Sequence, residues 1–364
     1  MNKFFSSFAP NIFRFTDRNM AMSIAASYTW AAAILVGMSM IQANGLIPYL
    51  VWFFSNGLAI IAFGYGATHW PKLYEVIRLP LFRLIILIVT TFTIWFNMSG
   101  LLYISDGLKI VSTNWGIVIA IVATLFTWAY IVWPRLMGGK VGGIHISIVT
   151  DRLQWMLVLS GVIVAVIITL ASKPQFISFQ LFTHPLNSIS AYYNAFWACP
   201  LLLTALFMDG MFWQRAPYIK TMKPYWQAYG MFMAYLALAA VLALFKIPDI
   251  ARWVVYICIF FAAMSTIDSC MAAYWHQISK KGGIIAGLVC IALWILVSRT
   301  PLLNLWWTLF SWFPLFFVIM IIAYKLMQAG KIKRPSEAVL RAADALPVLG
   351  DRKPFSEALR TWKD

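Results

Sequence analysis

Charged residues are scarce in this chain. Only 11% of its 364 residues are Asp, Glu, Lys or Arg, whereas 62% are hydrophobic and the mean hydropathy is +0.80. A soluble globular domain is normally about half apolar, so this composition excludes that class. The apolar residues form runs of roughly 17–25, which are long enough to cross a bilayer as helices. We therefore expect an integral membrane protein, embedded in a lipid bilayer.

Cysteine and histidine are also rare, with four residues of each. The cysteines lie inside apolar runs, without the paired spacing of zinc sites or disulfide frameworks. The histidines show no metal-ligand spacing either. A Walker-type phosphate loop is missing, because "MGGKVGG" lacks the required spacing and the following Ser or Thr. These absences argue against a metalloenzyme and against an ATP-driven pump, and we expect a protein that is not an enzyme.

Ten apolar runs follow one another along the chain. With a window of about 19 residues they fall at 22–44, 46–66, 79–103, 114–134, 146–172, 192–212, 225–245, 250–277, 282–298 and 302–327. The sequence thus predicts an all-α membrane protein with about ten transmembrane helices. It divides into an N-terminal interfacial segment, 1–21, a membrane core, 22–327, and a polar tail, 328–364.

Acidic residues are outnumbered by basic ones, 12 against 28, which gives a net charge of +16. All but five of the basic residues fall at the two ends of the chain, or in or close to the loops after even-numbered runs. Cytoplasmic loops carry the excess of Lys and Arg, so both termini are predicted to lie on the cytoplasmic side of a cell or inner membrane. This asymmetry explains the basic charge without a nucleic-acid partner.

The polar tail contains two helix-forming stretches, "PSEAVLRAADAL" and "FSEALRTW", each with a serine in the position of an N-cap. They predict two short amphipathic helices. Such helices either pack under the cytoplasmic face of the membrane core or dock a cytoplasmic partner.

The ten runs divide into two sets of five, at 22–172 and 192–327. Because five is odd, the second set crosses the membrane in the opposite sense to the first. This arrangement permits an inverted repeat, which places a substrate site at mid-membrane beside interrupted helices. Asn44, Gly45 and Pro48 interrupt the first run, and Pro200 with "MDG" lies in the sixth, which is the corresponding position.

A stripe of small and hydroxyl side chains marks the eighth run, within "FAAMSTIDS". Its members recur at i, i+3, i+4 and i+7, so they share one face of a helix; they are Ala262, Ser265, Thr266 and Ser269. Such a stripe serves either close helix packing or a site for a hard cation, which prefers oxygen ligands. Asp268 lies beside it, and a carboxylate inside a membrane run favours a functional role.

Three segments resemble motifs of the sodium/solute symporter family, in the same order. "AAMSTIDS" resembles the family's eighth span, "GGKVGGIHISIVTDRLQWMLVLSG" the beginning of its fifth, and "MDGMFWQRAPYIKTMK" the end of its sixth. Together they occupy much of the chain from about 134 to 280. The resemblance implies a LeuT-like core, a five-plus-five inverted repeat, and sodium-coupled symport of a small polar solute by alternating access.

The resemblance also implies a sodium site. Its expected ligands are Ala262, Ser265, Thr266, Gln42 and Gly45. Asp151 matches a family acid on the path by which sodium leaves toward the cytoplasm; the alternative is a loop acid paired with Arg152 or Arg135. Gln214 and Arg215 are expected to organise the cytoplasmic loop.

The chain also departs from the family's pattern. It is shorter than typical members, its first two runs are compressed, and Gln42 stands where a small residue is usual. Candidate substrate residues, each of them alternatively an ordinary packing or interfacial residue, are Asn44, Trp95, Asn97, Tyr193, Asn194 and Trp197. The scarcity of buried charge argues against a strongly charged substrate. The competing hypothesis is a non-transporting sensor or scaffold that presents its tail to a partner.

Overall fold

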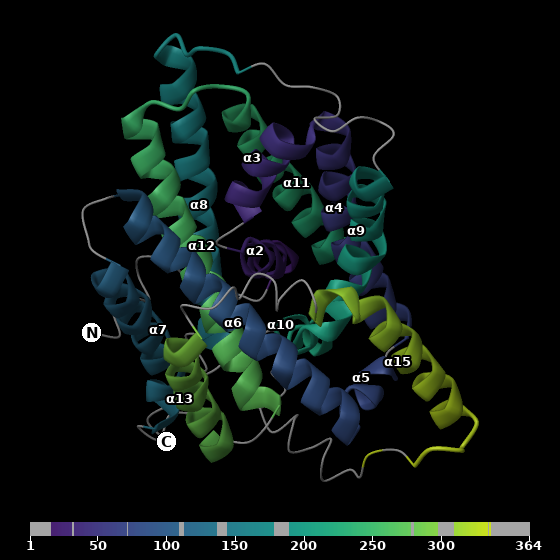
Figure 1. The fold of residues 1–364 in the computed structure, drawn as a ribbon. Coiled ribbons are helices and arrows are strands. Elements are labelled where there is room, and N and C mark those ends of the chain that lie inside the picture. Colours follow the sequence, from purple (N-terminus) through teal and green to yellow (C-terminus); the bar gives the residue numbers. More distant parts are fainter. Residues whose placement is uncertain are drawn as a thin grey trace.

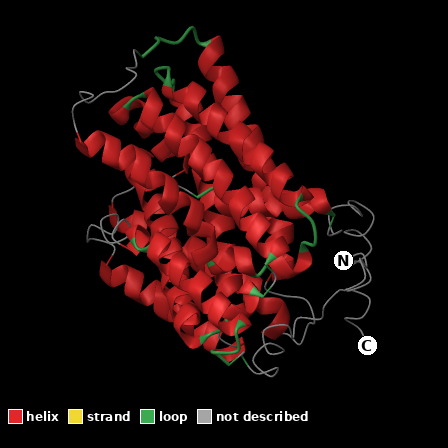
Figure 2. Cartoon of the chain, turned by 90° about the vertical axis from the view of Figure 1, so that its right-hand side faces the viewer, coloured by secondary structure: helices red, strands yellow, loops and turns green. Residues whose placement is uncertain are grey.

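The computed structural model describes residues 16–30, 33–70, 72–108, 113–136, 144–177, 189–277, 280–297, 309–333 and 335. Within these ranges every regular element is a helix, as Figures 1 and 2 show. The one β-type contact between them is an isolated bridge from Phe176 to Phe245, which joins the segments that follow two helices. The predicted all-α class is confirmed.

The helices keep the chain order of the predicted runs. They are α2 (Asp17–Tyr28), α3 (Ala33–Asn44), α4 (Leu46–His69), α5 (Leu73–Val76), α6 (Pro80–Leu108), α7 (Thr113–Leu136), α8 (Ile144–Ala171), α9 (Ile189–Met208), α10 (Gly210–Trp213), the 3-10 turn η1 (Ala216–Tyr218), α11 (Lys223–Ala243), α12 (Asp249–Gln277), α13 (Lys280–Val297) and α15 (Phe313–Gln328).

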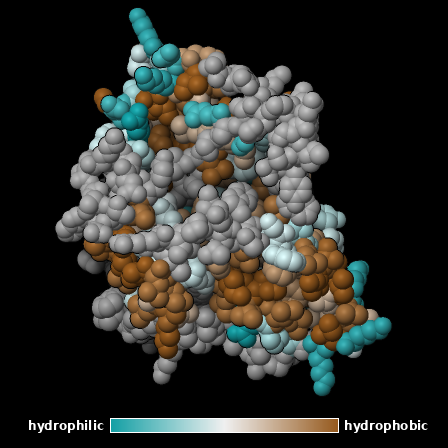
Figure 3. Space-filling view, viewed as in Figure 1, coloured by the Kyte–Doolittle hydropathy of each residue, from teal (hydrophilic) through white to brown (hydrophobic). Residues whose placement is uncertain are grey.

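Five of these helices are long and apolar enough to cross a membrane, namely α4, α6, α8, α11 and α12. Shorter apolar stretches lie in α7, α9, α13 and α15. Large apolar side chains stand on the outer faces, such as Ile167 at 59%, Phe126 at 64% and Leu296 at 75% exposed. Hydrophobic side chains also cover much of the lower part of the face in Figure 3. Exposed apolar surface of this extent is typical of a protein surrounded by lipid.

The first apolar run is two helices rather than one. The α2 helix ends at Tyr28, where the backbone N–H and the hydroxyl of Thr29 both donate to the carbonyl of Ala25, at 3.0 and 2.7 Å. We predicted the interruption at Asn44 and Gly45. Gly45 instead forms the turn between α3 and α4, with a φ of 97° that favours glycine.

The sixth run is interrupted as well. The α9 helix continues through Pro200 and ends at Met208. Asp209 then begins the short α10, and its carboxylate accepts the backbone N–H of Met211 at 3.0 Å, as an N-cap residue does. The first and sixth runs therefore both contain a change of helix, although neither change lies at a proline.

The centre of the bundle is formed by α2 and α12. Of the five long apolar helices α12 is the most enclosed, and it packs mainly against α8 and α6. The short α2 contacts α8, α11 and α12, and Figure 1 views it nearly end-on close to the middle of the molecule. Several polar side chains on these two helices are consequently buried, among them Ser23, Ser27, Ser265 and Asp268.

The contact between α4 and α11 supplies a test of the packing. Replacing Gly64 with alanine is expected to cost about 1–3 kcal/mol of stability. The added Cβ would lie 2.4 Å from Cγ and 2.8 Å from Cβ of Tyr225, atoms too close to the α11 backbone to move aside. Gly230 is the control, because a Cβ there meets no described atom within 4 Å. Gly230→Ala should unfold at the wild-type temperature or above it; equal melting temperatures for the two variants would contradict this packing.

Candidate functional site

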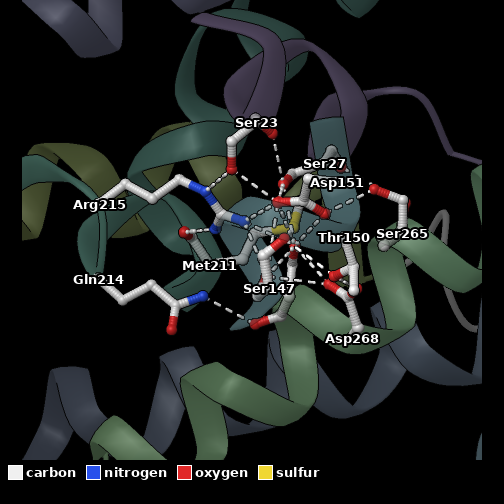
Figure 4. A network of polar contacts seen from close by, with 12 residues as sticks. Ser23, Ser27, Ser147, Thr150, Asp151, Met211, Gln214, Arg215, Ser265 and Asp268 are labelled. Carbon is white, nitrogen blue, oxygen red and sulfur yellow. Dashed lines mark hydrogen bonds and ion pairs between the residues drawn. The ribbon is translucent and has the colours of Figure 1, made fainter. Parts of the chain in front are cut away.

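A buried ion pair lies at the centre of the bundle. Arg215, which follows α10, places Nη2 2.6 Å from Oδ2 of Asp151 on α8, and the two side chains are 1% and 0% exposed. Figure 4 shows the pair surrounded by hydroxyl side chains from α2, α8 and α12. An ion pair this deep is stable only where further hydrogen bonds satisfy the remaining polar atoms of both partners.

Serine hydroxyls supply most of those bonds to Asp151. Ser23 donates to Oδ2 at 2.6 Å and Ser265 donates to Oδ1 at 2.7 Å, while Ser27 lies 3.3 Å from Oδ2. The guanidinium of Arg215 in turn donates to the hydroxyls of Ser23, at 2.9 Å, and Ser269, at 2.7 Å. The ion pair thus ties α2, α8, α12 and the segment after α10 together.

A second carboxylate, Asp268 on α12, lies beside this pair. It accepts hydrogen bonds from Tyr130 at 2.8 Å, Thr150 at 2.7 Å and Ser147 at 2.9 Å, and it is fully buried. The Ser147 hydroxyl also lies 3.4 Å from Asp151, so the two carboxylates are close neighbours. No basic side chain of the described residues forms an ion pair with Asp268.

We call this group the buried polar cluster. Its members are Ser23, Ser27, Tyr130, Ser147, Thr150, Asp151, Arg215, Ser265, Asp268 and Ser269. Over the described part of the chain it holds two carboxylates against one guanidinium. With both carboxylates ionised, the cluster carries one uncompensated negative charge inside an apolar bundle.

Oxygen atoms also converge at Thr266, next to the cluster. Its hydroxyl lies 3.1 Å from the carbonyl of Ala262 and 3.4 Å from the carbonyl of Ser27. The Ser27 carbonyl is available because α2 ends one residue later, which leaves its last carbonyls without partners in the helix. A hydroxyl and two carbonyls are ligands that suit a hard cation. The hydroxyl of Ser265, predicted as a ligand, instead donates to Asp151.

The other two predicted sodium ligands lie elsewhere. Gln42 is on α3, where its side-chain amide donates to the carbonyl of Ala243 on α11 at 3.2 Å. Gly45 is the turn before α4. The chain element that meets Thr266 is the end of α2, because the first run is interrupted after Tyr28 and not at Gly45.

Arg215 also corrects an expectation. We assigned it to the organisation of a cytoplasmic loop, but it is buried and forms the ion pair with Asp151. Asp151 thus pairs with Arg215 inside the bundle rather than in a loop. Its neighbour Gln214 is buried too, and donates to the carbonyl of Ser269 at 2.8 Å.

Three of the predicted substrate residues hydrogen-bond to nearby helical groups. Asn97 donates to the carbonyl of Thr93 in its own helix, Trp95 donates to the carbonyl of Cys290 on α13, and Asn44 bonds within α3. Contacts of this kind are also made by ordinary structural residues, so a substrate role for these three stays a prediction. The side chains of the other three lie outside the described residues: Tyr193, Asn194 and Trp197.

Sequence reasoning missed the contribution of α2. Ser23 and Ser27 are separated by four residues in "SIAAS", so they share a helix face, and this spacing was the signal available. Tyr130 gave no such signal, because nothing in its own segment points to Asp268.

Compared with known proteins, the sequence matches no family model, and no curated protein is significantly similar to it. The resemblance to sodium/solute symporters therefore rests on the three motifs alone. A function has to be argued from the geometry of the buried polar cluster.

Proposed function

We propose that this protein is a secondary active transporter that couples sodium entry to the uptake of a small polar solute by alternating access. The observation that carries the proposal is the composition of the buried polar cluster, in which two carboxylates meet one guanidinium within an apolar helical bundle. The ten predicted runs, arranged as a five-plus-five inverted repeat, supply the membrane-spanning core in this proposal.

The charge argument favours a bound monovalent cation. An ionised carboxylate removed from water costs several kcal/mol unless it is paired, and the guanidinium of Arg215 is already engaged by Asp151. Hydroxyl donors around Asp268 reduce this cost but bring no charge. A sodium ion held at Thr266 would supply the missing positive charge in the same low-dielectric region.

The interrupted helices support transport rather than a purely structural role. Transporters with inverted repeats hold ions and substrates where spanning helices are broken, because the free carbonyls and N–H groups there serve as ligands. Here the interruption after Tyr28 presents the Ser27 carbonyl to Thr266, and the second lies at Asp209. One sodium ion moving through about 100 mV supplies roughly 2.3 kcal/mol to drive such a cycle.

If the site binds sodium, sodium should stabilise the folded protein more than potassium does, and this difference should depend on Thr266. Sodium chloride should raise the melting temperature of the purified protein above that in equal potassium chloride. Thr266→Val should weaken the sodium affinity by about tenfold or more, because a charge-assisted contact worth roughly 1.5–3 kcal/mol is lost.

The matched control is Thr124→Val. Thr124 is equally buried, and its hydroxyl donates only to Ala120 in its own helix, α7. This variant should keep the wild-type sodium affinity. If sodium and potassium stabilise the wild-type protein equally, or if both variants respond to sodium alike, the proposed coupling ion is wrong.

A further inference from the structure

A small hollow lies where the two interrupted helices meet. Tyr28 and Trp30 line it from the end of α2, Asp209 and Phe212 from the junction of α9 and α10, and Phe313 from the start of α15. The rest of the lining is aliphatic, from α6 and α9. The hollow thus combines four aromatic rings with a single carboxylate.

The aromatic walls are set at steep angles to one another. The rings of Tyr28 and Trp30 are 6.3 Å apart at 76°, and those of Tyr28 and Phe212 are 5.8 Å apart at 77°. The hydroxyl of Tyr28 donates to Oδ1 of Asn56 on α4 at 3.1 Å, which orients that ring. Walls at such angles surround a ligand from several directions.

The carboxylate of Asp209 is incompletely satisfied. It is 3% exposed, and its firm hydrogen bond comes from the backbone N–H of Met211. The Thr93 hydroxyl lies 3.4 Å away, but its single proton has a closer acceptor in the Val89 carbonyl at 3.0 Å. No basic side chain of the described residues pairs with Asp209; Arg215, whose charge also acts on it, bonds Asp151 instead.

We infer that this hollow binds the positively charged ammonium head of a small organic solute. The inference rests on the proposed transport function and names its substrate class. An ammonium ion would pair with Asp209, and its N-methyl or methylene groups would contact the rings of Tyr28, Trp30, Phe212 and Phe313 through cation–π attraction. This differs from our expectation from the sequence, which disfavoured a strongly charged substrate.

Other ligand classes fit the hollow less well. A metal cation needs several oxygen ligands, whereas most of this lining is aromatic or aliphatic carbon. A neutral ligand would leave Asp209 buried without a counter-charge, and an anion would be repelled by it. The hollow is narrower than a water molecule needs, so the lining side chains must move apart on binding.

The test is binding of tetramethylammonium to the full-length protein in detergent, followed by tryptophan fluorescence at constant chloride. The neutral probe of similar size is tert-butanol. We expect saturable binding of tetramethylammonium only. Asp209→Asn should weaken it at least tenfold while preserving α10, because asparagine caps helices as well as aspartate does. Trp30→Leu should weaken it several-fold. The control is Asp249→Asn, since that side chain is 86% exposed and should not affect binding.

The outcomes separate this inference from the proposed coupling. If tetramethylammonium does not bind, if tert-butanol binds equally, or if Asp209→Asn binds like the wild type, the substrate class is overturned. Sodium-selective stabilisation, measured on the same samples, would still support the coupling ion in those cases. Conversely, Asp209-dependent binding of tetramethylammonium without a sodium effect would support the ammonium site and overturn sodium coupling. A wild-type melting temperature of Asp209→Asn in the absence of tetramethylammonium shows that this variant is folded.

Discussion

Replacing Arg215 with methionine is expected to destabilise the protein by about 3–5 kcal/mol. The substitution keeps most of the side-chain volume but leaves Asp151 without a counter-charge in a fully buried position. It also removes the guanidinium donors to Ser23 and Ser269. The measurement is unfolding in mixed micelles of increasing sodium dodecyl sulfate content.

Two further variants make this prediction specific to the ion pair. Asp151→Asn combined with Arg215→Met should recover much of the lost stability, because a neutral buried pair carries no desolvation penalty of this size. Arg252→Met is the control, since its pairing with Asp249 lies at the surface and exposed ion pairs contribute about 1 kcal/mol or less. A double variant as unstable as the sum of its single changes would show that the cost comes from lost packing, not from charge.

The positions of the helices along the chain could be predicted from the apolar runs of the sequence. Long apolar runs dictated the helices, and all ten predicted intervals contain helical residues. The interruption after Tyr28 was not predicted, because it involves neither glycine nor proline. The helix α2 ends there because the N–H and the hydroxyl of Thr29 both donate to the carbonyl of Ala25. Pro200 was expected to interrupt the sixth run, but α9 continues through it and ends only before Asp209.

The candidate site was predictable to the extent that its residues share one helix. Spacing alone placed Ser265 and Ser269 on one face of α12, and both reach Asp151. The partners from other helices were not accessible in this way. Arg215 lies in a basic segment that resembles a cytoplasmic loop, and only the packing of α10 against α12 brings it inside. Side chains that meet across helices are fixed by tertiary packing, which local sequence patterns do not encode.

The buried polar cluster has an energetic consequence for the protein without sodium. Asp151 has a guanidinium partner, whereas Asp268 has hydroxyl partners only. In the proposed coupling the uncompensated charge makes the sodium-free bundle less stable, and sodium binding relieves the penalty. The charge of Asp268 would thus lower the stability of the sodium-free protein and raise its affinity for sodium. Removing that charge tests both effects at once.

Replacing Asp268 with asparagine should raise the stability in potassium chloride by about 1–3 kcal/mol and weaken sodium affinity at least tenfold. Asparagine preserves the shape, and the hydroxyls of Tyr130, Thr150 and Ser147 can donate to its oxygen or accept from its amide nitrogen. Asp17→Asn is the control, because that side chain is 45% exposed and should change neither quantity by more than about 0.5 kcal/mol. Thermal unfolding of both variants over a sodium titration measures the two effects together. If Asp268→Asn instead lowers stability in potassium and keeps the full sodium response, then Asp268 serves as a structural hydrogen-bonding group and the charge argument for a bound cation fails.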